Sequence, residues 1–290
     1  MRVLVTGGAG FVGTNLIKRL VNEGHQVLSI DNYCTGTKEN HIDGCKYWDY
    51  DLSSNILPIE EMLATMRIEK LDCIYHLAAL ARIQPSLLNP KQSIENNVVS
   101  TINILDYARV NDSVIVYAGS SSVHHGVFDS PYAWSKYCGE QLVELYNKVY
   151  ELPAVICRFY NVYGPHQILG SDYAAVIGIW LDQYQKGEPL TTTGTGEQRR
   201  DFTHVDDIVD GLIRCGENID KVSGETFELG RGRNYSMNEI VDMFNGYPRK
   251  YIPPRKGEYE VTLCTDKKLT DMLDWKPNKN LPDYIKKILA

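Results

Sequence analysis

The chain has 290 residues, a formal net charge of −7 and seven cysteines with no CxxC pair. Such an acidic chain offers no basic surface to DNA or RNA, and an odd number of scattered cysteines predicts neither a disulfide framework nor a metal site. No segment has the apolar length of a membrane span or the pattern of a signal peptide, so we expect a cytoplasmic protein without nucleic-acid or membrane partners.

Strand patterns alternate with helical patterns along the chain. Strands are expected near Arg2, Gln26, Lys46, Asp72, Ser113 and Ala154. This alternation predicts an α/β protein with a doubly wound parallel sheet of the Rossmann type. The length suits a nucleotide-binding domain over residues 1–163 and a smaller substrate-binding lobe over residues 164–290. We expect the stretch of about 201–222 to pack back on the first domain.

The first motif is TGGAGFVG at residues 6–13, which lies between an apolar strand and an amphipathic helix. Gly7 permits a tight turn, Gly10 lets the backbone approach a pyrophosphate, and Gly13 lets the helix lie close to the strand. A turn of this kind can also be a plain connection, so the motif alone is weak. The residues expected at the phosphates are Gly7, Gly10, Phe11, Val12 and Gly13.

A second apolar strand ends in Asp31, where a carboxylate can accept hydrogen bonds from the adenosine ribose of a dinucleotide. A 2′-phosphate would be repelled there, and no arginine follows directly, which favours NAD over NADP. The pair Asp31 and Asn32 is also typical of a turn. Together with the glycine motif, we interpret it as a ribose site.

The segment YAWSK places Tyr132 and Lys136 four residues apart, so on a helix they share one face. A neighbouring ammonium lowers the pKa of a tyrosine, ordinarily about 10, toward that of a useful base. In isolation the same spacing is more often a solvated helix face. Upstream, an apolar strand runs into Ser120 and Ser121, at the end of a parallel strand where ligands bind. These four residues are the predicted catalytic set.

These motifs resemble the extended short-chain dehydrogenase/reductase family, and within it the nucleotide-sugar epimerases and dehydratases. The resemblance covers nearly the whole chain and keeps the order of the family's segments. Those segments are DNYCTG from Asp31, Asp51 with Leu52, YHLAA from Tyr75, NVVSTINIL from Asn97, RFYNVYGP from Arg158, YAAVI from Tyr173, GTGEQRRDFTHVDD from Gly194 and PPRKGE from Pro253.

The resemblance implies NAD as the cofactor, a UDP-linked sugar as the substrate and a homodimer as the assembly. It implies cofactor contacts at Asn32, Asp51, Leu52, Leu77, Ala78, Ala79, Asn97, Tyr132, Lys136 and Tyr160. It implies substrate contacts at Arg82, Asn161, Ala175, Val176, Arg200, Arg255, Glu258 and Thr262. The helices around 94–109 and from Tyr132 onward resemble the pair that forms the dimer interface in relatives, although their apolar stripes also suit an internal core.

In the family, the tyrosine removes a proton from a sugar hydroxyl as hydride leaves the same carbon for the nicotinamide. The lysine holds the nicotinamide ribose, and a serine binds the reacting oxygen; the alignment favours Ser120 and leaves Ser121 open. Dehydratases carry an acidic residue beside that serine, and this chain has no carboxylate between Gly119 and Gly126. The resemblance is therefore greatest to UDP-glucose and UDP-N-acetylglucosamine 4-epimerases. A dehydratase or reductase, or a non-catalytic NAD-binding protein, remains the alternative.

Several residues bear on the substrate. Arg200 and Arg255 suit the oxygens of a diphosphate. Thr262 lies at a position where, in the family, a large side chain restricts the substrate to plain hexoses and a small one admits N-acetylhexosamines, and threonine is small. Arg82 replaces a small residue of the family and suits a uronate carboxylate, which keeps UDP-glucuronate open. The shortened loop between 126 and 132 and the neighbouring His124 are departures from the family, and this histidine, like the one that follows it, is a candidate proton carrier.

Overall fold

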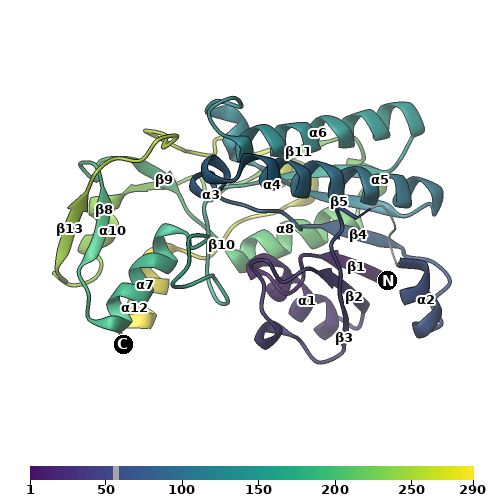
Figure 1. The fold of residues 1–290 in the computed structure, drawn as a ribbon, viewed down its shortest axis with the longest axis horizontal. Helices are drawn as coiled ribbons and strands as arrows, with labels where there is room; N and C mark the ends of the chain where they lie inside the picture. Colours follow the sequence, from purple (N-terminus) through teal and green to yellow (C-terminus); the bar gives the residue numbers. More distant parts are fainter. Residues whose placement is uncertain (55–58) are drawn as a thin grey trace.

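The computed structural model describes residues 1–54 and 59–290 and centres on a seven-stranded sheet (Figure 1). All neighbouring strands of this sheet are parallel, in the order β11-β6-β5-β4-β1-β2-β3. The strands are β1 Arg2–Thr6, β2 Gln26–Asp31, β3 Cys45–Asp49, β4 Cys73–His76, β5 Val114–Ser120, β6 Ala154–Phe159 and β11 Thr226–Leu229. The predicted α/β class is confirmed, and β11 is a seventh strand that the sequence reading did not include.

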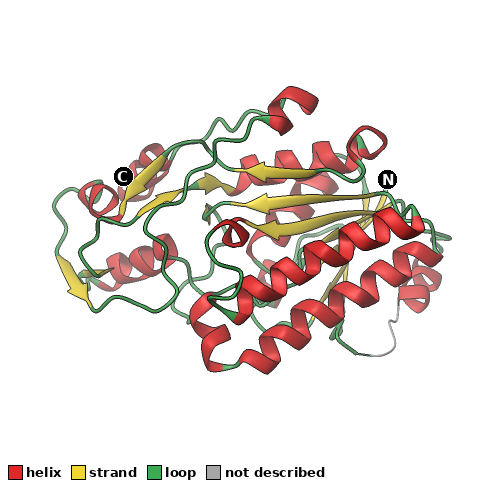
Figure 2. Ribbon diagram, turned by 90° about the horizontal axis from the view of Figure 1, so that it is seen from above, coloured by secondary structure: helices red, strands yellow, loops and turns green. Residues whose placement is uncertain are grey.

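Helices cover both faces of the sheet, as the view from above shows (Figure 2). Successive residues of β1 point to opposite faces: Val3 and Val5 belong to one buried cluster and Leu4 to the other. Strands buried on both faces become continuous apolar runs, which is why β1 reads RVLVT. On the first face lie α1 Phe11–Asn22, α8 Val205–Glu217, α9 Ile219–Val222 and α11 Lys268–Leu273. On the second lie α2 Ile59–Met66, α5 Ser100–Val110 and α6 Pro131–Tyr150.

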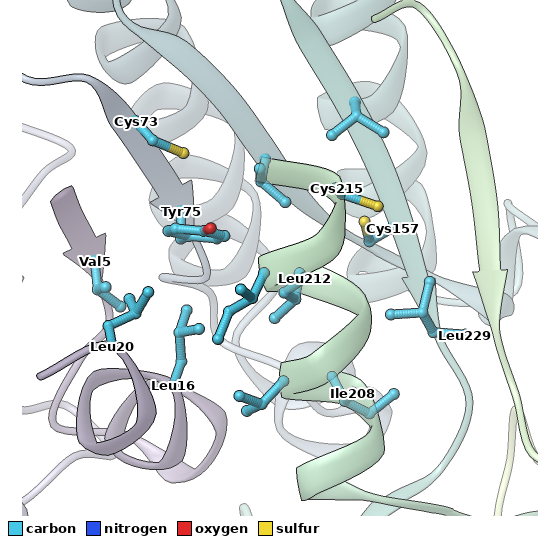
Figure 3. Close-up of a cluster of buried hydrophobic side chains, with 14 of the residues drawn as sticks. Val5, Leu16, Leu20, Cys73, Tyr75, Cys157, Ile208, Leu212, Cys215 and Leu229 are labelled. Carbon is cyan, nitrogen blue, oxygen red and sulfur yellow. The ribbon is translucent and has the colours of Figure 1, made fainter. Parts of the chain in front are cut away.

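The first buried cluster shows how a late segment joins the early strands. Figure 3 shows α8 between α1, which carries Leu16, and Leu229 at the end of β11, and the side chains of Ile208 and Leu212 on α8 belong to the same buried cluster. Burial of side chains of this size contributes about 1.5–3 kcal/mol each. This packing holds α8 against the sheet beside α1.

A third cluster forms the core of a smaller lobe. Trp180, Phe244 and Ile285 are among its fully or almost fully buried members. Its elements are α7 Val176–Lys186, β8 Leu190–Thr193, α10 Met237–Asp242, β13 Arg249–Ile252 and α12 Leu281–Leu289. The remaining strands pair two by two: β7 Val162–Tyr163 with β10 Thr203–His204, β9 Arg199–Asp201 with β12 Asn234–Ser236, and β8 with β13. The chain passes from the large sheet to the lobe at β7, which follows β6, and returns at β10, which pairs with β7 and leads directly into α8.

The remaining short elements lead into the helices around the site. The 3-10 turns are Lys38–Asn40 and Ser121–His124, and α3 Ile83–Leu88 is followed by α4 Pro90–Ile94 and a π-helical turn Glu95–Val99 before α5. In the part of the chain that the structure describes, no helix has both the length and the apolar character of a membrane span.

Candidate active site

A cavity of about 760 Å³ lies at the carboxyl ends of the strands, where the chain order changes between β1 and β4. Open parallel sheets bind their ligands at such switch points. The predicted residues that line it from the large domain are Gly7, Gly10, Phe11, Val12, Gly13, Asp31, Asn32, Leu52, Leu77, Ala78, Ala79, Arg82, Ser120, Ser121, Tyr132, Lys136 and Tyr160. From the smaller lobe and the segment that leads to it come Asn161, Ala175, Val176, Arg200, Arg255, Glu258 and Thr262.

Two predicted cofactor residues lie elsewhere among the described residues. Asp51 Oδ1 accepts hydrogen bonds from the amide and the hydroxyl of Ser53, which stabilise the turn directly after Asp51. Asn97 is buried and braces the cavity wall from behind, with its amide bonded to Leu80 and to the hydroxyl of Ser135. Neither side chain lines the cavity in this structure, so a direct cofactor contact of either stays a prediction.

The glycine turn between β1 and α1 leaves no room for side chains. Gly7 has a φ of +70°, and a Cβ on Gly13 would lie 2.2 Å from the carbonyl oxygen of Gly7. The helix begins after Gly10, and no side chain caps its first amides. Those amides therefore face the cavity with the positive end of the helix dipole, which fits a pyrophosphate.

Asp31 ends β2 at the rim of the same cavity. Its Oδ2 accepts the amide of Ala9 at 2.9 Å and its Oδ1 accepts the amide of Tyr33 at 2.8 Å. Burial raises the pKa of this carboxyl group, and the two amides oppose that effect. Each oxygen of this carboxylate accepts one amide and keeps a further lone pair for a ribose hydroxyl. Its negative charge would repel the 2′-phosphate of NADP. The pocket residues thus fit an unphosphorylated adenosine ribose.

Tyr132 stands at the first turn of α6, which Ser130 caps by accepting the amide of Ala133 at 3.1 Å. The Tyr132 hydroxyl donates to Ser120 Oγ at 3.4 Å, and Ser120 Oγ also accepts the Ser122 hydroxyl at 2.9 Å. Of the two candidate serines, Ser120 is the one in contact with Tyr132, while Ser121 lines the cavity nearby.

Lys136 lies one helical turn after Tyr132 and is only 4% exposed. Its Nζ sits 4.2 Å from the centre of the Tyr117 ring, and burial lowers the pKa of Lys136 to about 8. Burial raises the pKa of Tyr132, whereas the Ser120 hydrogen bond and the Arg82 charge lower it. Arg82 is thus a second cation beside the tyrosine, which the Tyr-Lys spacing does not reveal.

The sequence reading missed a buried ion network behind Ser120. Glu140 has no exposed surface; its Oε1 accepts the Ser120 amide at 3.2 Å, and its Oε2 accepts Arg158 Nη2 at 2.7 Å. Arg158 Nη1 donates to Glu228 at 3.0 Å, and Glu228 also pairs with His124. One signal was available, because Glu140 follows Lys136 by four residues and extends the same helix face.

Both candidate proton-carrying histidines lie outside the cavity lining in the described structure. The contact of His124 with Glu228 raises the pKa of this histidine. The His125 ring stacks on Tyr259, with the ring centres 4.7 Å apart, and burial lowers the pKa of His125. The geometry gives them structural contacts and no place at the tyrosine.

Three arginines line the cavity, and each is distinct in its contacts. Arg200 donates to the carbonyl oxygen of Arg199 at 2.9 Å, Arg255 belongs to the loop after β13, and Arg82 is the one whose charge lowers the pKa of Tyr132. Asn161 Nδ2 donates to Thr262 Oγ1 at 3.2 Å. A glycine turn that suits a pyrophosphate, a tyrosine bonded to a serine, and three guanidinium groups thus line one space, which suits proton exchange with a hydroxyl of a phosphorylated ligand.

Comparisons with known proteins agree with this geometry. Residues 3–230 match the model of the NAD dependent epimerase/dehydratase family. A putative UDP-glucose 4-epimerase of Methanocaldococcus jannaschii is 31% identical over 99% of this chain and 97% of its own length. The UDP-glucose 4-epimerase of Thermotoga maritima, solved with UDP-glucose, has a TM-score of 0.90 at 26% identity and covers 100% of this chain and 97% of its own.

A second solved structure is the UDP-glucuronic acid 4-epimerase of Bacillus cereus, solved with UDP-glucuronic acid and NAD. It has a TM-score of 0.86 at 26% identity and covers 99% of this chain and 100% of its own. The family model spans most of the chain and the relative from Methanocaldococcus nearly all of it. The chain belongs to the NAD-dependent epimerase/dehydratase family.

Proposed function

We propose that the protein is a 4-epimerase of UDP-linked hexoses that works through a transient 4-keto sugar. The observation that carries this proposal is the Tyr132 and Ser120 pair, which faces a dinucleotide cradle, while the turn that follows Ser120 carries no acidic residue as far as Gly126. The acidic residues of the described cavity lining are Asp31, Asp172 and Glu258. The nearest carboxylate along this wall, Glu140, is held by Arg158 and the Ser120 amide and does not line the described cavity. Elimination of water needs such an added acid or base, so the site favours epimerisation over dehydration.

The proposed roles follow from the contacts. Bound NAD supplies reversible hydride acceptance at C4 of the sugar. Tyr132 Oη takes the proton of the C4 hydroxyl, and Ser120 Oγ holds the same oxygen by a hydrogen bond. The Arg82 charge lowers the pKa of Tyr132 and so favours the phenolate form. Lys136, one helical turn away, is proposed to hold the nicotinamide ribose and to add to that positive charge. Arg200 and Arg255 hold the diphosphate, so that the reacting sugar can present either face to the cofactor.

The deciding experiment is a product assay on purified protein with UDP-glucose, UDP-N-acetylglucosamine and UDP-glucuronate. Chromatography that resolves 4-epimers would be run without added NAD and again with it. A 4-epimer from any of the three supports the proposal, and a net keto sugar or reduced cofactor points instead to a dehydratase or reductase. Absence of every product contradicts a UDP-sugar 4-epimerase.

Thr262 tests the size of the space beside the sugar. The side chain lines the cavity and its hydroxyl accepts the Asp201 amide at 3.0 Å. Thr262→Tyr adds a ring to that space and is expected to abolish turnover of UDP-N-acetylglucosamine while sparing UDP-glucose. The matched Thr262→Val variant loses the same hydrogen bonds without adding a ring, and should keep the wild-type ratio of the two rates. Equal loss of both sugars in Thr262→Tyr alone would contradict this role.

The outer face of α5 and α6 supports a homodimer. The exposed apolar side chains on these two helices include Ile102, Val110, Leu145, Val149 and Tyr150. Exposed apolar side chains that gather on one surface are typical of a protein–protein interface. We expect light scattering to give the mass of two chains. The double variant Leu145→Lys/Val149→Glu is expected to shift it to one chain, whereas Met272→Lys, on α11 and also exposed, should not. A wild-type monomer would contradict the dimer.

A further inference from the structure

Arg82 is a cavity cation whose hydrogen bonds, within the described structure, go only to backbone carbonyls. It ends the loop after β4 and precedes α3. Its Nε donates to the Tyr173 carbonyl oxygen at 2.7 Å, and its Nη1 donates to the Ala81 carbonyl oxygen at 2.8 Å. These two hydrogen bonds fix the side chain in place and use two of the five N–H groups of the guanidinium. The N–H groups on Nη2 have no partner among the described residues and remain available to a ligand.

Arg82 has no anionic partner among the described residues, unlike the two arginines that pair with carboxylates in the large domain. Arg2 pairs with Asp72, and Arg158 pairs with two glutamates. Burial lowers the pKa of Arg82, which reflects the cost of holding a charge away from water. A desolvated cation is stabilised when an anion arrives, and no carboxylate of the described residues lies within ion-pair distance of it. The missing anion is therefore expected on the ligand.

The position of Arg82 decides which part of the ligand carries that anion. The amides at the start of α1 suit the cofactor's pyrophosphate, and Arg200 and Arg255 come from the smaller lobe, where the substrate's diphosphate is proposed to lie. Arg82 instead precedes α3, whose Ser86 hydroxyl accepts the amide of Tyr132, the proposed base at C4 of the sugar, at 3.2 Å, and the Arg82 charge lowers the pKa of Tyr132. The anion must then be carried by the sugar itself, close to C4.

A hexose offers few such positions. The carbon atoms bonded to C4 are C3 and C5, and a hexuronate carries its carboxylate on C5. A guanidinium fork matches the two oxygens of a carboxylate in one plane, with bonds roughly twice as strong as neutral ones. We propose that Arg82 binds the carboxylate of a UDP-hexuronate, so that acidic sugars are the preferred substrate class. The preference rests on the 4-epimerase proposed above, but the binding it requires can be measured without turnover.

The test uses Tyr132→Phe protein, in which ligand affinity is read by calorimetry without reaction. We expect UDP-glucuronate to bind more tightly than UDP-glucose. Adding Arg82→Gln should weaken UDP-glucuronate about 30-fold to 100-fold and UDP-glucose less than about 3-fold. Arg82→Lys keeps the positive charge but not the two parallel N–H donors, so its affinity for UDP-glucuronate should lie between those of the proteins with Arg82 and with Arg82→Gln. This variant also provides the test if Arg82→Gln fails to fold. Arg19→Gln removes a guanidinium outside the cavity and should change neither affinity.

Several outcomes overturn the assignment. Equal weakening of both sugar nucleotides by Arg82→Gln would place Arg82 at the diphosphate, and loss of NAD affinity would place it at the cofactor. Unchanged binding of UDP-glucuronate would remove its role altogether. Turnover of the wild-type protein is measured in parallel. If only UDP-glucose is epimerised and Arg82→Gln weakens neither sugar nucleotide more than the other, this inference is refuted and the proposed function stands. Discrimination in binding without any epimer refutes the proposed function and keeps the carboxylate site.

Discussion

Replacement of Tyr132 by phenylalanine is expected to lower kcat for 4-epimerisation by about 10²-fold to 10⁴-fold. The change removes one oxygen atom, the one that contacts Ser120 Oγ at 3.4 Å and faces the cavity. The ring, which packs in the first turn of α6, remains, so the cavity should keep its shape. Affinity for NAD, measured by fluorescence or by the cofactor retained on purification, should stay within a few-fold of wild type, because the glycine turn and Asp31 are untouched.

The matched control is Tyr137→Phe, on the same helix but with a partly exposed side chain outside the cavity. It should leave kcat unchanged. Turnover retained by Tyr132→Phe would mean that another group is the base, and Ser120 would then be the next to replace. Loss of NAD together with turnover would instead indicate a structural role for the hydroxyl.

The fold was predictable because strands buried on both faces must be apolar throughout. The six predicted strands lie where the sequence places them, from β1 at Arg2 to β6 at Phe159. The seventh, β11, has only four residues and pairs with β6 across about 70 intervening positions. The equally short β4 is buried throughout, whereas β11 alternates buried and partly buried residues and forms no continuous apolar run. Its strand identity comes from the partner edge that tertiary structure supplies.

The site divides in the same way. Gly7, Gly13 and Asp31 are set by local backbone requirements and the end of a strand, so the sequence locates them. Asn97 is expected at the cofactor, and in the structure its side-chain amide bonds Leu80 and Ser135 behind the cavity wall, so that a cofactor contact stays a prediction. Sequence patterns place a residue on an element, but the direction of its side chain depends on rotamers and neighbours. Contacts such as Arg82 with the Tyr173 carbonyl depend on the meeting of the two lobes and have no local signal.

The ion network behind Ser120 is the feature least visible in the sequence. Its members come from α6, β6 and β11, and only the parallel pairing of β6 with β11 brings Arg158 beside Glu228. The network holds the backbone of Ser120, because Glu140 Oε1 accepts that amide. Its integrity therefore bears on both stability and the position of a proposed catalytic residue.

Arg158→Met is accordingly expected to destabilise the protein by about 3–5 kcal/mol, because it leaves Glu140 and Glu228 buried without their shared cation. For a chain of this size the thermal midpoint should fall on the order of 6–10 °C near pH 7.5. Arg19→Met, which breaks the exposed pair with Glu23 on α1, should cost less than about 1 kcal/mol. Differential scanning calorimetry of the two variants and the wild type compares them directly.

The pH dependence identifies the cause. Burial raises the pKa of Glu140 and Arg158 opposes that effect, so Arg158→Met should raise this pKa further. An acid whose pKa is higher in the folded than in the unfolded state binds more protons when folded, and its contribution to stability falls as the pH rises through that interval. The deficit of Arg158→Met should thus be largest at pH 7.5 and shrink toward pH 5. Adding Glu140→Gln should recover part of the midpoint at pH 7.5. A deficit independent of pH, with no recovery in the double variant, would trace the loss to packing of the arginine stem and not to an unpaired buried carboxylate.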